Sequence, residues 1–189
     1  AGAAVAYERA LAINPRAGWS AMQLAHCATF LRDFPRAEAA ARLAVTLQRT
    51  FLSGRTGMVI IGAHMRLGHV FALEGRHREA LEQYGHELEF VDEVGHALRG
   101  RIVIELQQRI GEARIALGEE AEGRAALDLA VEACRRRMRT GADDPMSPYY
   151  GACACALLGD TGEALAFLEL AAAKRPQLTA AAQALKPGA

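Results

Sequence analysis

Residues 67–84 read LGHVFALEGRHREALEQY, a stretch whose spacing predicts two helices joined by a tight turn. Gly68 has no side chain and lets the first helix press against the second. Gly75 stands seven residues later, just past the first helix, where a left-handed cap conformation is needed. Ala80 then lets the second helix approach closely, and Tyr84 fills the space that remains between them.

The same spacing returns along the chain and indicates an internal repeat. Gly111 and Gly118 are again seven residues apart, and they are followed by Gly123 as a small residue and Leu127 as a large one. The other occurrences are Ala152, Gly159, Ala164 and Leu168; Ala25, Arg32, Ala37 and Ala41; and a second half alone over 3–15. Together these segments cover nearly the whole chain.

These residues resemble the tetratricopeptide repeat (TPR), whose pattern is W-x2-L-G-x2-Y, then A-x3-F, then P. Leu67-Gly68-x2-Phe71 followed by Ala80-x3-Tyr84 is the best match. The resemblance implies an all-α fold, a right-handed superhelix (α-solenoid) of about four and a half hairpins with a C-terminal capping helix. Because the first residues match only the second half of a repeat, we interpret the array as N-terminally truncated.

The repeat is longer than the family period of 34 residues. Ala25 and Gly68 are 43 residues apart, Gly68 and Gly111 are also 43 apart, and Ala152 follows Gly111 by 41. HEAT and armadillo repeats have periods in this range and are the alternative architecture. We favour elongated TPR hairpins, because the spacings inside each hairpin keep their register and the extra residues fall between hairpins.

The pattern predicts a single array over 1–189 that begins with a half-hairpin over 1–15. Full hairpins are predicted over 16–52, 58–93, 98–140 and 145–176. Their helices are expected near 17–31 and 35–52, 58–73 and 77–93, 98–117 and 120–139, and 146–158 and 161–174. A last helix over 177–185, after Pro176, is predicted to cap the stack, because an open end would expose apolar surface.

The composition fits an all-α chain and narrows the class of partner. Hydrophobic residues make up 51% and can bury a core, while Lys+Arg and Asp+Glu both number 22. A formal net charge of zero argues against a nucleic-acid binder, which needs excess positive charge. No apolar run reaches the roughly 18 residues of a membrane span. Scattered Cys27, Cys134, Cys153 and Cys155 favour reduced thiols and a cytoplasmic location.

The resemblance also implies a binding groove, because the first helices of TPR hairpins line a concave surface. The positions of this chain that correspond to the groove are Trp19, Met22, His26, Met65, Arg66, His69, Glu105, Gln108, Arg109, Glu112, Tyr149, Tyr150 and Cys153. Trp, Tyr, Met and Arg are typical of protein interfaces. A Met or aromatic residue at helical spacing is also common in cores, so we expect about half of the set to pack between helices, with Trp19 the foremost candidate.

Some TPR proteins hold a C-terminal carboxylate with a Lys/Asn/Arg clamp, which this chain does not reproduce. The Lys and Asn members are absent, and Glu105 would repel a carboxylate. A chaperone co-factor role is therefore disfavoured. A groove with Arg66 and Arg109 beside Glu105 and Glu112 suits a peptide of mixed charge with apolar anchors.

No motif for catalysis or for a cofactor is present, so we expect neither an enzyme nor a metal site. His26, His69 and Cys153 occupy equivalent repeat positions, which lie too far apart to bind one metal ion. The basic run over 135–139 falls at a predicted helix C-terminus, and Asp143 and Asp144 precede the next helix as N-cap residues do.

The sequence therefore predicts a cytoplasmic scaffold that binds another protein or a peptide in the concave groove. The alternative is a regulatory or oligomerisation module of a larger enzyme or signalling protein whose catalytic domain lies elsewhere. Neither nucleic acid nor a membrane is an expected partner, and homo-oligomerisation stays open. The identity of the partner is not encoded in any motif that we recognise.

Overall fold

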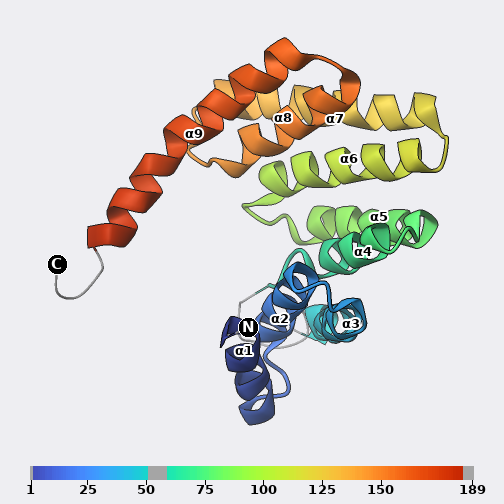
Figure 1. Ribbon diagram of the computed structural model, residues 1–189, viewed down its shortest axis with the longest axis vertical. Helices are drawn as coiled ribbons and strands as arrows, with labels where there is room; N and C mark the ends of the chain where they lie inside the picture. The colour runs from blue at the N-terminus through green and yellow to red at the C-terminus, as the bar shows by residue number, and fades with distance from the viewer. Residues whose placement is uncertain (1, 51–58, 185–189) are drawn as a thin grey trace. The chain divides into compact units, whose positions relative to one another are not determined.

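The computed structural model of the chain describes residues 2–50 and 59–184. Within those ranges it contains nine α-helices and no strand, as the sequence predicted (Figure 1). The helices are α1 Gly2–Ile13, α2 Gly18–Phe30, α3 Phe34–Thr50, α4 Ala63–Leu73, α5 His77–Val94, α6 Arg99–Ala116, α7 Glu120–Arg139, α8 Met146–Leu158 and α9 Thr161–Ala184. They form two compact units, Ala1–His96 (unit 1) and Ala97–Ala189 (unit 2).

Each unit is built from helical hairpins in which neighbouring helices pack side by side. In unit 1, α2 pairs with α3 and α4 with α5, while α1 packs on α2 and α3 packs on α4. In unit 2, α6 pairs with α7 and α8 with α9, and α7 packs on α8. The first helices of successive hairpins are also in contact, α2 with α4 and α6 with α8. These pairings are the ones that stacked hairpins require.

Glycine allows the helices of the α6–α7 hairpin to approach closely. A Cβ atom built on Gly111 would lie 2.6 Å from Cγ of Leu127 and 2.9 Å from the carbonyl oxygen of Gly123. A Cβ atom on Gly123 would in turn lie 2.6 Å from Cγ1 of Ile115. The predicted roles of the small and large residues in this hairpin are therefore confirmed.

The turn inside each hairpin uses a left-handed residue, as the spacing predicts. Gly75, Gly118 and Gly159 have φ angles of 77°, 80° and 87°. The first hairpin has Arg32 at this position with φ of 57°, a conformation that is strained for a residue with a side chain. The N–H of Asp33 still reaches back to the carbonyl of Ala28 at 3.0 Å, which closes the helix in the usual way.

Two helix boundaries differ from the prediction, whereas the others agree to within one residue wherever the chain is described. Helix α4 begins at Ala63 rather than near 58, because Gly62 has a φ of 94° and cannot continue a helix. Helix α9 continues through Pro176, where we expected a helix end and a separate cap. Proline removes one main-chain hydrogen bond, but the alanine-rich sequence on both sides favours helix strongly enough to retain it.

The last hairpin also uses a different large residue from the one that the repeat spacing predicts. Phe167 exposes 6% of its surface and packs in the core of unit 2, whereas Leu168 is 42% exposed. A Cβ atom on Gly151 would lie 2.6 Å from Sγ of Cys134 and 3.3 Å from the Phe167 ring. Helix α8 therefore packs against α7 and α9 through Gly151.

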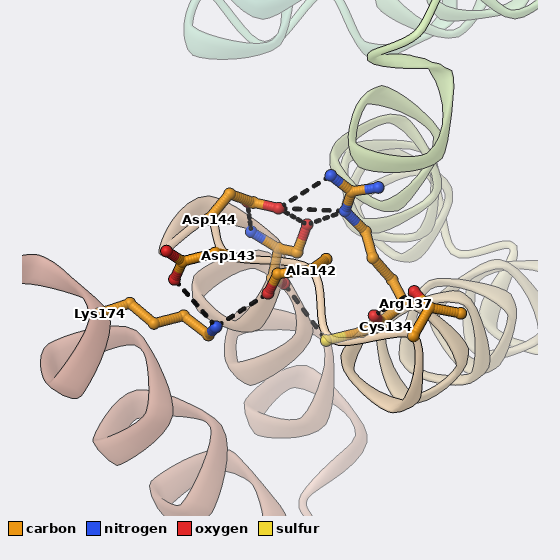
Figure 2. A network of polar contacts seen from close by, with 8 residues as sticks. Cys134, Arg137, Ala142, Asp143, Asp144 and Lys174 are labelled. Carbon is orange, nitrogen blue, oxygen red and sulfur yellow. Dashed lines mark hydrogen bonds and ion pairs between the residues drawn. The ribbon is translucent and has the colours of Figure 1, made fainter.

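Charged side chains form hydrogen bonds and ion pairs around the turn between α7 and α8 (Figure 2). Nε of Arg137, in the last turn of α7, donates to Oδ2 of Asp144 at 3.0 Å. Asp144 also accepts a hydrogen bond from the main-chain N–H of Ser147 at 2.8 Å, so it caps the start of α8 as predicted. Lys174 of α9 donates to the carbonyl oxygen of Ala142 at 2.8 Å and holds α9 against this turn.

Candidate functional site

The first helices of the hairpins share a burial pattern at equivalent positions. In the first three of these helices the inner positions, Met22, Met65 and Gln108, each expose only 6% of their surface. Two turns further along each helix lies a set of exposed residues, which we call the outer row: Phe30, Leu73, Ala116 and Leu157. The steps along the outer row are 43, 43 and 41 residues, as in the sequence repeat.

The structure divides the thirteen predicted groove residues into accessible and buried ones. The accessible or partly accessible residues are Trp19, His26, Arg66, His69, Arg109, Glu112, Tyr149, Tyr150 and Cys153. The other four, Met22, Met65, Glu105 and Gln108, are buried inside their units, and we had expected about half of the set to pack between helices. Met22, for example, belongs to a core cluster with Ala44, Ile60 and Ala63.

In unit 1 the accessible residues form a surface that we call the α2–α4 face. Its members are Trp19, Gln23, His26 and Phe30 on α2, and Arg66, His69 and Leu73 on α4. Trp19 is 55% exposed and Phe30 is 76% exposed, although Trp19 was the residue we most expected to be packed. The rings of His26 and Phe30 meet edge to face, with their centroids 4.7 Å apart. Large apolar side chains are thus held open to solvent on this face.

In unit 2 the corresponding α6–α8 face is organised around the Glu105 carboxylate. The O–H of Tyr150 donates to Oε1 of Glu105 at 2.8 Å, and Arg109 donates to the same oxygen at 3.0 Å and 3.2 Å. The Arg109 guanidinium also lies 5.8 Å from the centre of the Tyr150 ring. Glu105 is therefore buried and paired within the unit, and it is not the exposed carboxylate that we expected to repel a ligand's carboxylate.

The electrostatics of this face favour stable, unreactive side chains. Burial raises the pKa of Tyr150, and the neighbouring Glu105 carboxylate raises it further. Burial also raises the pKa of Cys153, although a hydrogen bond with Tyr149 opposes that shift. A thiol with a raised pKa is a poor nucleophile. The exposed surface here includes the Tyr149 ring, 44% exposed, and the carboxylate of Glu112.

Glu87 of α5 is a buried carboxylate, 0% exposed, that we did not predict from the sequence. Its oxygens accept hydrogen bonds from the main-chain N–H groups of Gly62 at 2.6 Å, His64 at 2.9 Å and Met65 at 3.3 Å. Glu87 therefore caps the N-terminus of α4. The N-cap residue of α4, Gly62, makes no side-chain hydrogen bond of its own. Nε2 of Gln48 on α3 lies 3.4 Å from the same carboxylate, so this contact joins three helices.

Two opposing effects act on the proton of Glu87. Burial raises its pKa, while the N–H donors of Gly62 and Met65 lower it, and the net direction is upward. A sequence signal for this residue existed: Glu87 shares one helical face with Ala80, Tyr84 and Val91, all of which are buried. A carboxylate on the apolar face of a helix indicates a buried acceptor that needs donors.

The described residues contain no group of three or more His, Cys, Asp or Glu side chains that could hold a metal ion. Two histidines do come close in unit 1, where the rings of His64 and His86 lie 5.3 Å apart. His64 Nδ1 is hydrogen bonded to Gln83 Oε1 at 2.8 Å, which orients its ring. In the same parts of the chain, no helix is long and apolar enough to cross a membrane.

No protein-family model and no curated protein matches the sequence. Among solved structures, MamA superposes with a TM-score of 0.55 at 14% identity, over 93% of this chain and 88% of that chain. A Podospora anserina protein with nearly identical TPR-like repeats, described as a kinesin light chain, gives a TM-score of 0.56 at 18% identity, over 93% and 86%. YrrB, described as a TPR protein with an unusual peptide-binding site, reaches a TM-score of only 0.37 at 16% identity and carries no argument.

These likenesses concern the fold and distinguish between the two architectures that the repeat length left open. The superposed protein with TPR-like repeats spans nearly the whole chain, and the hairpins keep the small and large residues of the TPR pattern. The chain therefore has the helical-hairpin fold of tetratricopeptide-repeat proteins.

Proposed function

We propose that this protein is an interaction scaffold that holds a segment of another protein on the exposed faces of its first helices. The observation that carries the proposal is the outer row, which places apolar side chains at the same exposed position of successive hairpins. Phe30 is 76% exposed, Leu73 49% and Leu157 42%. Apolar residues scattered singly over a surface need no explanation, but exposed large side chains that recur at one position of the repeat in both units do.

A partner that covers these residues would gain affinity from their burial. Fully burying a Phe or Leu side chain is worth about 1.5–3 kcal/mol relative to leaving it exposed. Trp19 lies on the same face as Phe30 and adds a second large aromatic surface. Interfaces typically combine such anchors with a polar rim, which His26 and Arg66 would provide.

Affinity capture with the whole chain tests the proposal when a variant of the outer row is compared with a control variant on the second helices of the hairpins. The face variant replaces Phe30, Leu73 and Leu157 with Ser, and the control replaces Leu43 of α3 and Leu129 of α7, which are 37% and 59% exposed. Partners that the wild type and the control retain, and that the face variant loses, support the proposal. If the face variant retains every partner while its circular dichroism is unchanged, the proposal is wrong.

A second candidate function is self-association through α9. Leu165 and Leu168 lie one turn apart on this helix and are 56% and 42% exposed. In a stack of hairpins, the next repeat would cover such a pair. Light scattering of the wild type and of a Leu165→Ser, Leu168→Ser variant tests this function. A wild type that is monomeric at high concentration would rule it out.

A further inference from the structure

The α2–α4 face differs from the rest of unit 1 in the distribution of charge. Helices α2 and α4 contain no Asp or Glu, whereas the acidic residues of unit 1 lie on α1, α3 and α5 or in the turns at their ends. The charged and titratable side chains on the face are Arg66, His26 and His69. The surface that exposes Trp19 and Phe30 is thus neutral to positive.

Several carboxylates of α1, α3 and the α4–α5 hairpin are paired with arginines. Glu38 of α3 accepts from Arg42 at 2.8 Å and from Arg76 at 2.8 Å. Arg76 also binds Glu79 at 2.6 Å, and Arg36 pairs with Glu8 of α1. These ion pairs join α1, α3 and the α4–α5 hairpin, so arginine side chains offset the negative charge of these carboxylates.

The α6–α8 face of unit 2 has the opposite character. Helix α6 contributes Glu105 and Glu112, and Glu112 is exposed beside Tyr149 and Cys153. Arg109 is committed to Glu105 at 3.0 Å. The α6–α8 face therefore presents an exposed carboxylate, whereas α2 and α4 contribute none to the α2–α4 face.

We infer that the α2–α4 face takes a protein segment that combines carboxylate side chains with large apolar ones. This inference rests on the proposed function and names the partner's chemistry for one of its two faces. Apolar side chains of the segment would cover Phe30, Trp19 and Leu73, while its carboxylates would lie toward Arg66, His26 and His69. Complementary charge of this kind sets which partner binds and how fast, more than it sets the affinity.

Trp19 is the one tryptophan of the chain and lies on this face, so its fluorescence reports binding directly. The probe is a synthetic peptide of interspersed Leu and Glu residues, compared with a Leu/Lys peptide and a Ser/Glu peptide of the same length. We expect the Leu/Glu peptide to shift Trp19 emission to the blue and to bind about ten-fold more tightly than either comparison peptide. Added salt should weaken its binding.

A matched pair of variants locates the effect on the face. Gln23→Glu places a carboxylate on α2 within the face, and Ala39→Glu places one on the exposed side of α3. Gln23→Glu should weaken the Leu/Glu peptide about five-fold, as a like charge at an exposed site does, and Ala39→Glu should leave it unchanged. If both variants bind the Leu/Glu peptide equally weakly, the overall charge of the protein is the cause, and the inference is overturned.

The outcomes separate this inference from the proposed function. If the Leu/Lys peptide binds as tightly as the Leu/Glu peptide, the inference is overturned. The same holds if no peptide shifts Trp19 emission while the Phe30, Leu73 and Leu157 variant still loses a captured partner. If that variant loses no partner, the proposed function itself has failed.

Discussion

Replacing Glu87 with alanine tests how the N-terminus of α4 is held. The substitution removes the acceptor of the N–H groups of Gly62 and Met65, both of which are buried, and of His64, which is partly accessible to water. A buried donor left without a partner costs about 1–3 kcal/mol. Two such donors predict a loss of about 2–6 kcal/mol, and water entering the vacated space would move the value toward the lower end.

The assay is urea unfolding followed by Trp19 fluorescence, since Trp19 and Glu87 belong to the same compact unit. Glu89→Ala is the matched control, because Glu89 is on the same helix and its side chain is 82% exposed. We expect the control to change the free energy of unfolding by less than about 0.5 kcal/mol. Hydrogen exchange at Gly62 and Met65 should accelerate in the Glu87 variant alone. If both variants unfold at the same urea concentration, this account of the α4 N-terminus is wrong.

The difference in unfolding free energy between wild type and Glu87→Ala should change with pH in a predictable direction. Burial raises the pKa of Glu87 in the folded protein, so the folded state holds the proton more tightly than the unfolded state. This group therefore stabilises the fold below the ordinary Glu pKa of about 4.3, and the contribution is lost as the pH rises through the folded pKa. The stability difference between wild type and Glu87→Ala should be widest below about pH 4 and should narrow toward neutrality. A difference that widens with pH would contradict the reasoning.

Four further substitutions test other features of the fold. Gly111→Ala forces a Cβ atom to within 2.6 Å of Leu127 and should cost about 1–3 kcal/mol in chemical unfolding. Gly85→Ala fills open space inside α5 and should instead stabilise by about 0.5–1 kcal/mol, so the reverse order would refute the packing argument. Asp144→Ala removes the cap of α8 and should cost about 1 kcal/mol. Although burial opposes it, hydrogen bonding holds the pKa of Asp144 low, so this cost should shrink as the pH falls below about 4 in thermal unfolding. Tyr150→Phe removes one hydrogen-bond donor from the buried Glu105 carboxylate and should lower the free energy of unfolding in urea by about 1 kcal/mol. An unchanged urea midpoint would show that this hydrogen bond does not stabilise the fold.

The fold was predictable because the residues that determine it act at short range. The seven-residue step from Gly68 to Gly75 encodes a helix, its end and a turn, and all three are present in the structure. The helix end expected at Pro176 was wrong, because we gave this one proline more weight than the long alanine-rich segment around it. Leu168 was chosen over Phe167 because spacing alone cannot say which of two adjacent large residues faces inward.

The candidate site was less predictable, because exposure depends on which helices cover a position. Transfer from the repeat family placed Met65 and Glu105 in a groove, but both pack inside their units. The outer row follows the predicted positions by one helical turn, from His26 to Phe30 and from His69 to Leu73. The periodicity that located the first helices would have identified this row if it had been extended by one turn.

Glu87 shows why one kind of prediction lies beyond local spacing. Its position on the buried face of α5 could be read from the sequence, but its donors come from Gly62, His64 and Met65, more than twenty residues earlier. Those N–H groups lie in the first turn of α4, where they have no partner within the helix, because Gly62 has a φ of 94° and α4 begins at Ala63. The helix boundary therefore explains how the buried carboxylate obtains its donors. We predicted the boundary too early because we had not assigned the carboxylate a partner.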